Sequence, residues 1–245
     1  MVITSKQNPL VKELSSLKEK KGRREKGTFL VEGAKMVCEC VKSGLEIVRL
    51  AVREDYAGDT FGLPVVVLGE DAFRAVCDEK TPQGVLAEVK LPVRVVEPPK
   101  NSCLLLDGVS DPANVGAIIR TAVAAGYEEL YLADCADPYA PKSVRASMSG
   151  VFFANIMRGT REEIVKALKG VPLIAADMDG ESVFTFTPPE KFCLCIGNEG
   201  NGLSDGVRSR AKHTVKIPMD ARTESLNAAV SAGILMYQLN SQFHR

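Results

Sequence analysis

The stretch at residues 192–207 reads FCLCIGNEGNGLSDGV and decides how the chain is interpreted. Its apolar run ends in a loop with glycines at positions 197, 200 and 202, and a helix-like segment follows. This order of strand, glycine loop and helix is typical of a nucleotide-binding site. The loop contains no lysine, however, and it places the carboxylate of Glu199 between the glycines. Any ligand bound here must therefore tolerate an acid beside it.

Neither of the common phosphate-binding motifs fits this loop. A P-loop requires G-x-x-x-x-G-K-[ST], and the lysine is absent. A Rossmann fingerprint reads G-x-G-x-x-G in the first βα unit, whereas this loop reads G-x-x-G-x-G near the end of the chain. S-adenosylmethionine fits better, because its adenosine carries no phosphate and its sulfonium is positive. A glycine-rich turn without any ligand is the alternative.

Composition limits the class of protein. A chain of 245 residues favours one or two domains, and 45% hydrophobic residues are enough for a full core. The formal net charge is zero, so affinity for a nucleic acid must come from local basic patches. We find neither the apolar core of a signal peptide nor a run long enough to span a bilayer, and we expect no membrane partner.

The cysteines and histidines exclude several kinds of site. Seven cysteines occur without a C-x-x-C pair, and only two histidines are present, so zinc-ligand spacing is absent. Two histidines also disfavour Ser-His-Asp and Cys-His enzymes. We expect buried, reduced thiols in a cytoplasmic protein that holds no metal.

The chain divides at a proline-rich segment. Residues 91–101, LPVRVVEPPKN, contain three prolines and no periodicity, so we place a linker at 93–101. Before it, a small α/β domain (1–92) is predicted to contain a helix over 9–21, a basic loop at 20–27 and a helix over 33–43. After it, strands and helices alternate through 102–245, which predicts an α/β domain with a mostly parallel sheet.

The second domain has clear element boundaries. Its strands are predicted at 104–109, 129–134, 151–156, 172–177 and 192–197. A helix over 111–126 has Asp111 as N-cap, Pro112 in its first turn and Gly126 just beyond its end. A last helix over 225–239 is rich in small residues, and Ser225 is its N-cap candidate.

Three segments together resemble the SpoU (TrmH) branch of the SPOUT RNA methyltransferases. They are DGVSDPANVGAIIRTAVAAG (107–126), CIGNEGNGLS (195–204) and IPMDARTESLNAAVSAG (217–233). Between the first two, PYAPKSVRASMSGVFF (138–153) is also similar to that family. FLVEGAKMV (29–37) and TPQGVLAEV (81–89) resemble the small ribosomal-protein-like RNA-binding domain that precedes the catalytic domain in many members.

This resemblance implies a fold, an activity and a set of residues. The C-terminal domain is expected to form a trefoil knot and to transfer a methyl group from S-adenosylmethionine to a ribose 2′-hydroxyl of structured RNA, as a homodimer. The implied catalytic residues are Asn114, Arg120, Glu199, Ser225 and Asn227. The implied cofactor-binding residues are Gly197, Ile217, Met219 and Leu226.

Arg120 has two possible roles in this scheme. The family assigns it to the chemistry, often as a general base, but a guanidinium is so strongly basic that deprotonating it in a protein is costly. An electrostatic clamp on the forming alkoxide and a neighbouring phosphate suits it equally well. Glu199 is expected to pair with Arg120 or to position it, which accounts for an acid inside the glycine loop.

The RNA-contacting residues are predicted from the basic run of the N-terminal domain and, for the last two, from their place in the family-like segment 138–153. They are Lys20, Lys21, Arg23, Arg24, Lys142 and Arg145. The N-terminal extension favours ribosomal RNA as substrate, and a tRNA ribose methyltransferase is the alternative within the class. A non-catalytic RNA-binding protein and a nicotinamide-dependent oxidoreductase are the alternatives from other classes.

Overall fold

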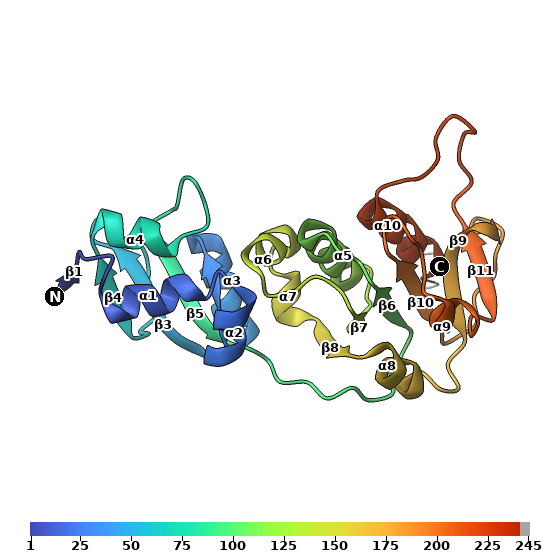
Figure 1. Ribbon diagram of the computed structural model, residues 1–245, viewed down its shortest axis with the longest axis horizontal. Coiled ribbons are helices and arrows are strands. Elements are labelled where there is room, and N and C mark those ends of the chain that lie inside the picture. The colour runs from blue at the N-terminus through green and yellow to red at the C-terminus, as the bar shows by residue number, and fades with distance from the viewer. Residues whose placement is uncertain (241–245) are drawn as a thin grey trace. The chain divides into compact units, whose positions relative to one another are not determined.

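The computed structural model describes residues 1–240, and it forms two compact units (Figure 1). The N-terminal unit holds Met1–Val93 together with Asp137–Phe152. The C-terminal unit holds Arg94–Ala136 and the chain from Phe153 onward. No helix among residues 1–240 is both long and apolar enough to cross a membrane.

The N-terminal unit is built on a five-stranded mixed sheet. Its order is β1-β4-β3-β5-β2, and β5 runs antiparallel to both of its neighbours. The strands are β1 (Val2–Ile3), β2 (Thr28–Glu32), β3 (Ile47–Arg53), β4 (Val65–Leu68) and β5 (Val85–Lys90). The helices are α1 (Pro9–Ser16), α2 (Lys20–Lys26), α3 (Ala34–Ser43), α4 (Glu70–Val76) and α6 (Pro141–Ser147). Apolar residues of α1 and α4 pack with those of the central strands in one core.

The predicted basic loop at 20–27 is wrong, because this segment is the helix α2. Lysine, arginine and glutamate are good helix formers, so the run needs little else to become helical. Gly22 does not break the helix: a Cβ there would lie 2.1 Å from the carbonyl oxygen of Ser16, so the glycine allows a close approach. The helix ends at Gly27, whose φ of 66° is the left-handed conformation of a glycine C-cap.

Residues 137–152 pack with the N-terminal unit although they lie far along the chain. The ring centroids of Phe29 and Tyr139 are 5.0 Å apart, and α6 contacts β2. Arg23 forms an ion pair with Asp137 at 2.7 Å. This segment therefore depends on residues 1–93 for its partners.

The C-terminal unit confirms the predicted α/β class. Its six-stranded sheet has the order β11-β9-β10-β6-β7-β8, and every pair is parallel. The strands are β6 (Cys103–Asp107), β7 (Glu129–Ala133), β8 (Asn155–Gly159), β9 (Leu173–Ser182), β10 (Cys193–Gly197) and β11 (His213–Lys216). The helices are α5 (Pro112–Ala124), α8 (Arg161–Ala167), α9 (Asp205–Arg208) and α10 (Ala228–Leu239). The trefoil knot stays a prediction.

One predicted strand is partly wrong. Residues 150–153 form a single helical turn, α7 (Gly150–Phe153), and the strand β8 starts only at Asn155. A short apolar run such as VFF is buried in either conformation, so its pattern cannot distinguish a strand from a helical turn.

The strand order predicts a binding site at the carboxyl ends of the central strands. The chain proceeds outward through β6, β7 and β8, then crosses to β9 and returns to insert β10 beside β6. In parallel sheets, ligands bind outside the carboxyl ends of the strands where the order reverses. The residues that follow β6 and β10 are therefore the first place to look for a site.

Candidate active site

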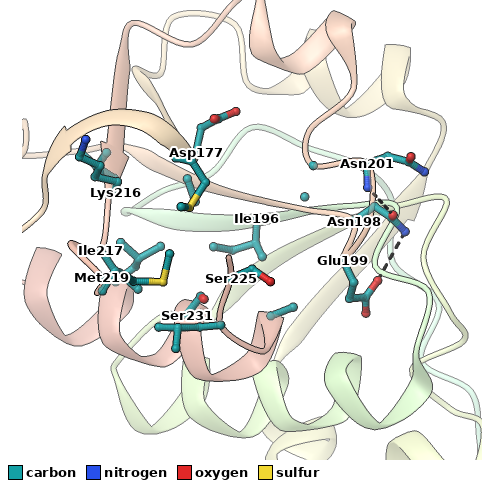
Figure 2. Close-up of a pocket in the computed structure, with 18 of the residues that line it drawn as sticks. Asp177, Ile196, Asn198, Glu199, Asn201, Lys216, Ile217, Met219, Ser225 and Ser231 are labelled. Carbon is teal, nitrogen blue, oxygen red and sulfur yellow. Dashed lines mark hydrogen bonds between the residues drawn. The ribbon is translucent and has the colours of Figure 1, made fainter. Parts of the chain in front are cut away.

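A pocket of about 340 Å³ lies at the carboxyl ends of β10 and β11 and against the middle of β9, beside α10 (Figure 2). The four residues predicted to bind the cofactor, Gly197, Ile217, Met219 and Leu226, all line it. Figure 2 shows Ile217 and Met219 on one side and Glu199 on the other. The pocket therefore joins an apolar wall to a polar one, which fits an adenosine carrying a charged tail.

The glycine loop is folded back on itself. The amide of Asn198 donates to the carbonyl of Gly202 at 2.9 Å, and the amide of Gly202 donates to the carbonyl of Asn198 at 3.0 Å. A Cβ on Gly197 would lie 2.2 Å from the carbonyl carbon of Gly202, so only glycine fits there. Inside the turn, the Asn198 side-chain oxygen accepts from the amides of Gly200 and Asn201, both at 3.0 Å.

Glu199 is held by the start of α5. Its carboxylate accepts hydrogen bonds from the Ser110 amide at 3.2 Å, the Ser110 hydroxyl at 3.1 Å and the Asn114 side chain at 2.9 Å. Desolvation raises the pKa of Glu199, but the hydrogen bonds from Asn114, Ser110 and Asp111 outweigh it and hold this pKa below its usual value. Glu199 is therefore an anionic anchor at a helix N-terminus, where the macrodipole favours negative charge.

The expected ion pair between Glu199 and Arg120 is wrong for a single chain. The carboxylate of Glu199 is occupied by the groups at the start of α5. Arg120 is exposed, does not line the pocket, and has no acid within ion-pair distance among residues 1–240.

Asn114 connects the glycine loop to α10. The side-chain amide of Asn227 donates to the side-chain oxygen of Asn114 at 3.0 Å. The Asn227 oxygen accepts from the amides of Ala229 and Val230, at 2.9 and 3.3 Å, and so caps α10. The predicted N-cap, Ser225, is therefore wrong: asparagine is an equally good cap, and Ser225 lines the pocket two residues earlier.

A second anchor of the loop was not predicted from the sequence. Asp107 ends β6 and is only 1% exposed. One of its oxygens accepts from both the amide and the hydroxyl of Ser204, at 2.8 and 2.6 Å. The other accepts from Arg161 at 2.6 Å, and Arg161 also pairs with Asp134. A polar residue at the carboxyl end of a buried strand was the signal that could have identified it.

The pocket also contains an ion pair that the sequence did not indicate. Asp177 and Arg208 both line it, with a guanidinium nitrogen 2.7 Å from a carboxylate oxygen. Lys216 lines the same pocket. Charged groups of both signs therefore surround the space that a cofactor with an amino-acid tail would fill.

The predicted RNA-contacting residues have different surroundings. Lys20, Lys21, Arg24 and Lys142 are exposed. The prediction that Arg23 contacts RNA is wrong. Arg23 is only 3% exposed, and it donates hydrogen bonds to Asp137 and to the carbonyls of Leu17 and Lys18. Its donors stabilise the N-terminal unit and are not available to a phosphate. Arg145 is half-buried and pairs with Asp78 at 2.6 Å.

Comparison with known proteins agrees with this geometry. Residues 101–237 match the SpoU rRNA Methylase family, and residues 8–87 match the MRM3-like substrate binding domain. The chain is 33% identical over 244 residues to a 23S rRNA (guanosine(2553)-2′-O)-methyltransferase, RlmP, from Bacillus subtilis, covering 97% of this chain and 98% of that protein.

Two solved structures with bound AdoMet (S-adenosylmethionine) are similar over nearly the whole chain. The SpoU methyltransferase AviRb from Streptomyces viridochromogenes has a TM-score of 0.88 and 28% identity, covering 96% of this chain and 98% of that one. An rRNA methyltransferase from Sinorhizobium meliloti has a TM-score of 0.88 and 29% identity, covering 97% and 96%. With its family model matched over more than half its length, this chain belongs to the SpoU rRNA methylase family, as its motifs predicted.

Proposed function

We propose that this protein transfers a methyl group from S-adenosylmethionine to a ribose 2′-hydroxyl of ribosomal RNA. The observation that carries the proposal is the pocket of Figure 2, formed by the glycine loop and the segment before α10 and containing no phosphate-binding lysine motif. Family membership supports it, as do relatives named as 23S rRNA 2′-O-methyltransferases.

The cofactor is held mainly by backbone and apolar groups in this scheme. Gly197, Ile217 and Leu226 present backbone groups to the adenosine, and Met219 packs beside it. S-adenosylmethionine supplies an activated methyl group on a sulfonium. The carboxylate of Glu199, on the polar side of the pocket, is compatible with that positive charge, whereas it would repel a phosphate.

The chain's contribution to the reaction is positioning and charge. The ribose oxygen must approach the methyl group in line with the bond that breaks, so a fixed hydroxyl supplies much of the rate. The hydrogen bonds from Glu199 through Asn114 to Asn227 keep the loop, α5 and α10 in one arrangement. Arg120 serves as an electrostatic clamp on the forming alkoxide, because its guanidinium remains charged.

Arg120 performs this role in the pocket of a second subunit. It does not line the pocket of its own chain. The helix α10 offers a surface for a homodimer, since Val230 and Tyr237 are 52% and 43% exposed although they are large and apolar. A C2 dimer through this region would bring each Arg120 toward the partner's cofactor.

The N-terminal unit binds the RNA in this account. The exposed side chains of Lys20, Lys21 and Arg24 all belong to helix α2. The exposed Lys142 belongs to the same unit. Ribosomal RNA is preferred over tRNA because the relatives that match this chain along its full length include an rRNA enzyme. All seven cysteines are free thiols, which suits the cytoplasm where ribosomes assemble.

The proposal is tested by supplying both substrates. Purified protein is titrated with S-adenosylmethionine by calorimetry and then incubated with labelled donor and either 23S rRNA or total tRNA. Saturable cofactor binding with methyl transfer to 23S rRNA alone supports the proposal. Transfer to tRNA alone supports the alternative substrate, and RNA binding without any transfer supports the non-catalytic alternative.

A further inference from the structure

A second hollow, of about 480 Å³, lies on the C-terminal unit away from the cofactor pocket. It is bounded by α8, the turn that leads into β9 and the segment that leads into β11. Its rim carries four cations and one acid: Lys166, Lys169, Arg210, Lys212 and Glu162. Its floor is apolar, with Val165, Leu168, Val171 and Leu173 joining the core beneath the sheet.

The four cations are not neutralised by the protein. All four are exposed, and none has an acid within ion-pair distance in the part of the chain that the structure describes. Acids outnumber lysines and arginines over residues 94–136 and 153–240, so these four cations form a positive cluster on a unit whose net charge is negative. Like charges gathered around one concavity repel each other, and a polyanion relieves that repulsion.

The backbone that carries these cations is fixed. The amide of Val171 donates to the carbonyl of Leu168 at 3.0 Å, and the amide of Lys212 donates to the carbonyl of Leu173, also at 3.0 Å. Leu168 and Leu173 are buried in the core. The rim therefore presents its charges from anchored positions, with only the side chains free to adjust.

The hollow is separate from the reaction centre. It adjoins the amino ends of β9 and β11, whereas the cofactor pocket adjoins the middle of β9 and the carboxyl end of β11. Ala176 is three residues further along its strand than Leu173, and Lys216 is three further than His213, which corresponds to about 10 Å along the strand. Phosphates of one strand of a DNA duplex are spaced about 3.4 Å apart along its axis, so about 10 Å corresponds to a few nucleotides.

We propose that this hollow binds the phosphate backbone of the substrate RNA, a few nucleotides from the ribose that is methylated. The inference rests on the proposed function, in which the substrate is RNA. The hollow adds sequence-independent affinity and orients the RNA on the catalytic unit, separately from the contacts of the N-terminal unit.

The test uses the full-length protein and a variant that removes two charges, Lys169→Gln with Lys212→Gln. The matched control, Arg94→Gln with Lys100→Gln, removes the same charge from exposed side chains of the same unit outside the hollow. RNA affinity is measured over a range of salt concentrations with a 23S rRNA fragment that the wild type methylates. Cofactor affinity and the melting temperature are measured alongside.

The hollow variant should bind RNA more weakly, and the slope of log affinity against log salt should fall by about 2, roughly one for each phosphate that the variant no longer neutralises. Its kcat at saturating RNA and its cofactor affinity should match the wild type, so only KM for RNA rises. Glu162→Gln removes the acid on the rim and should tighten RNA binding.

Equal affinity and equal salt slope in the hollow variant and the control would overturn the inference. So would normal RNA binding combined with loss of binding to an acidic protein segment, which would identify a protein as the occupant. A wild type that neither binds nor methylates any RNA would instead refute the proposed function, so the two failures are distinguishable.

Discussion

Asn114 donates a hydrogen bond to Glu199 at 2.9 Å although 85 residues of sequence separate them. This hydrogen bond explains why an acid occupies the middle of a glycine loop. The carboxylate attaches the loop to the first turn of α5, where exposed amides and the helix dipole favour an anion. Asn227 continues the connection to α10, so one carboxylate fixes three segments around the pocket.

Glu199→Gln should weaken cofactor binding, because an amide offers only one acceptor oxygen to a site filled with donors. The pKa of Glu199 in the folded protein is below its usual value. The stabilisation that the ionised carboxylate provides is therefore fully present at pH values above the usual pKa of a glutamate. It is lost as the pH falls through the lower pKa of the folded state. Wild-type cofactor affinity should therefore hold down to the ordinary pKa of a glutamate and decline only below it. Calorimetry at several pH values checks this, with the glutamine variant lacking that decline. A wild-type decline centred near pH 6 would contradict it.

Two glycines of the loop should respond differently to a methyl group. Gly197→Ala places a Cβ 2.2 Å from the backbone of Gly202 and should abolish cofactor binding. Gly200→Ala meets nothing closer than 3.7 Å, at the Asn198 oxygen, and should bind the cofactor normally. Equal affinity in the two variants would show that the loop does not hold the conformation described.

Asp107→Asn should destabilise the protein and loosen the loop. The substitution replaces one acceptor oxygen by a donor that faces either Ser204 or Arg161, at a cost of about 2 kcal/mol in unfolding free energy. Asp134→Asn is the control, since Asp134 pairs with the same arginine but does not contact Ser204. Urea unfolding and cofactor titration of both variants measure the loss of stability and of cofactor affinity. Similar destabilisation of both would argue against a specific role for Asp107.

The N-cap of α10 can be tested directly. Asn227→Ala removes the acceptor for two helix amides and should lower the free energy of unfolding by about 1 kcal/mol. Ser225→Ala should leave it nearly unchanged, because Ser225 does not cap the helix. The opposite ranking in chemical denaturation would restore Ser225 as the cap.

The placement of Arg120 in a second subunit predicts complementation. Arg120→Ala should bind the cofactor normally but not methylate, and Ala176→Trp should fill the pocket and prevent cofactor binding. If the arginine acts across the dimer, mixing the two variants and allowing them to exchange subunits restores one working site in each mixed dimer. About a quarter of wild-type activity is then expected, because half of the dimers are mixed. An inactive mixture, with exchange verified, would place the arginine in its own chain's site.

Much of the fold was predictable because its signals are local. The alternation of strands and helices indicated the parallel sheet, and Asp111, Pro112 and Gly126 marked the ends of α5 as the structure has them. Helix α2 was missed because a run of charged residues is usually an exposed loop, whereas the close approach of Gly22 to Ser16 is something that sequence cannot show.

The site was predictable only where motif residues coincide with the pocket. Gly197, Ile217, Met219 and Leu226 line it as expected. The partners of Glu199 were not predictable, since an acid in one motif and an arginine in another suggest an ion pair, while the fold brings Ser110 and Asn114 to the acid instead. The burial of Arg23 escaped prediction for a similar reason: Asp137 lies 114 residues away, and nothing local indicates the pairing.

The most direct test of the central claim is to identify the methylated atom. Unmodified 23S rRNA is incubated with the protein and S-adenosylmethionine labelled in the methyl group, digested to nucleosides and resolved by mass spectrometry. The account predicts label in a single 2′-O-methylated nucleoside, with none when Arg120→Ala replaces the wild type. Label on a base, or none from the wild type despite saturating donor, would contradict it.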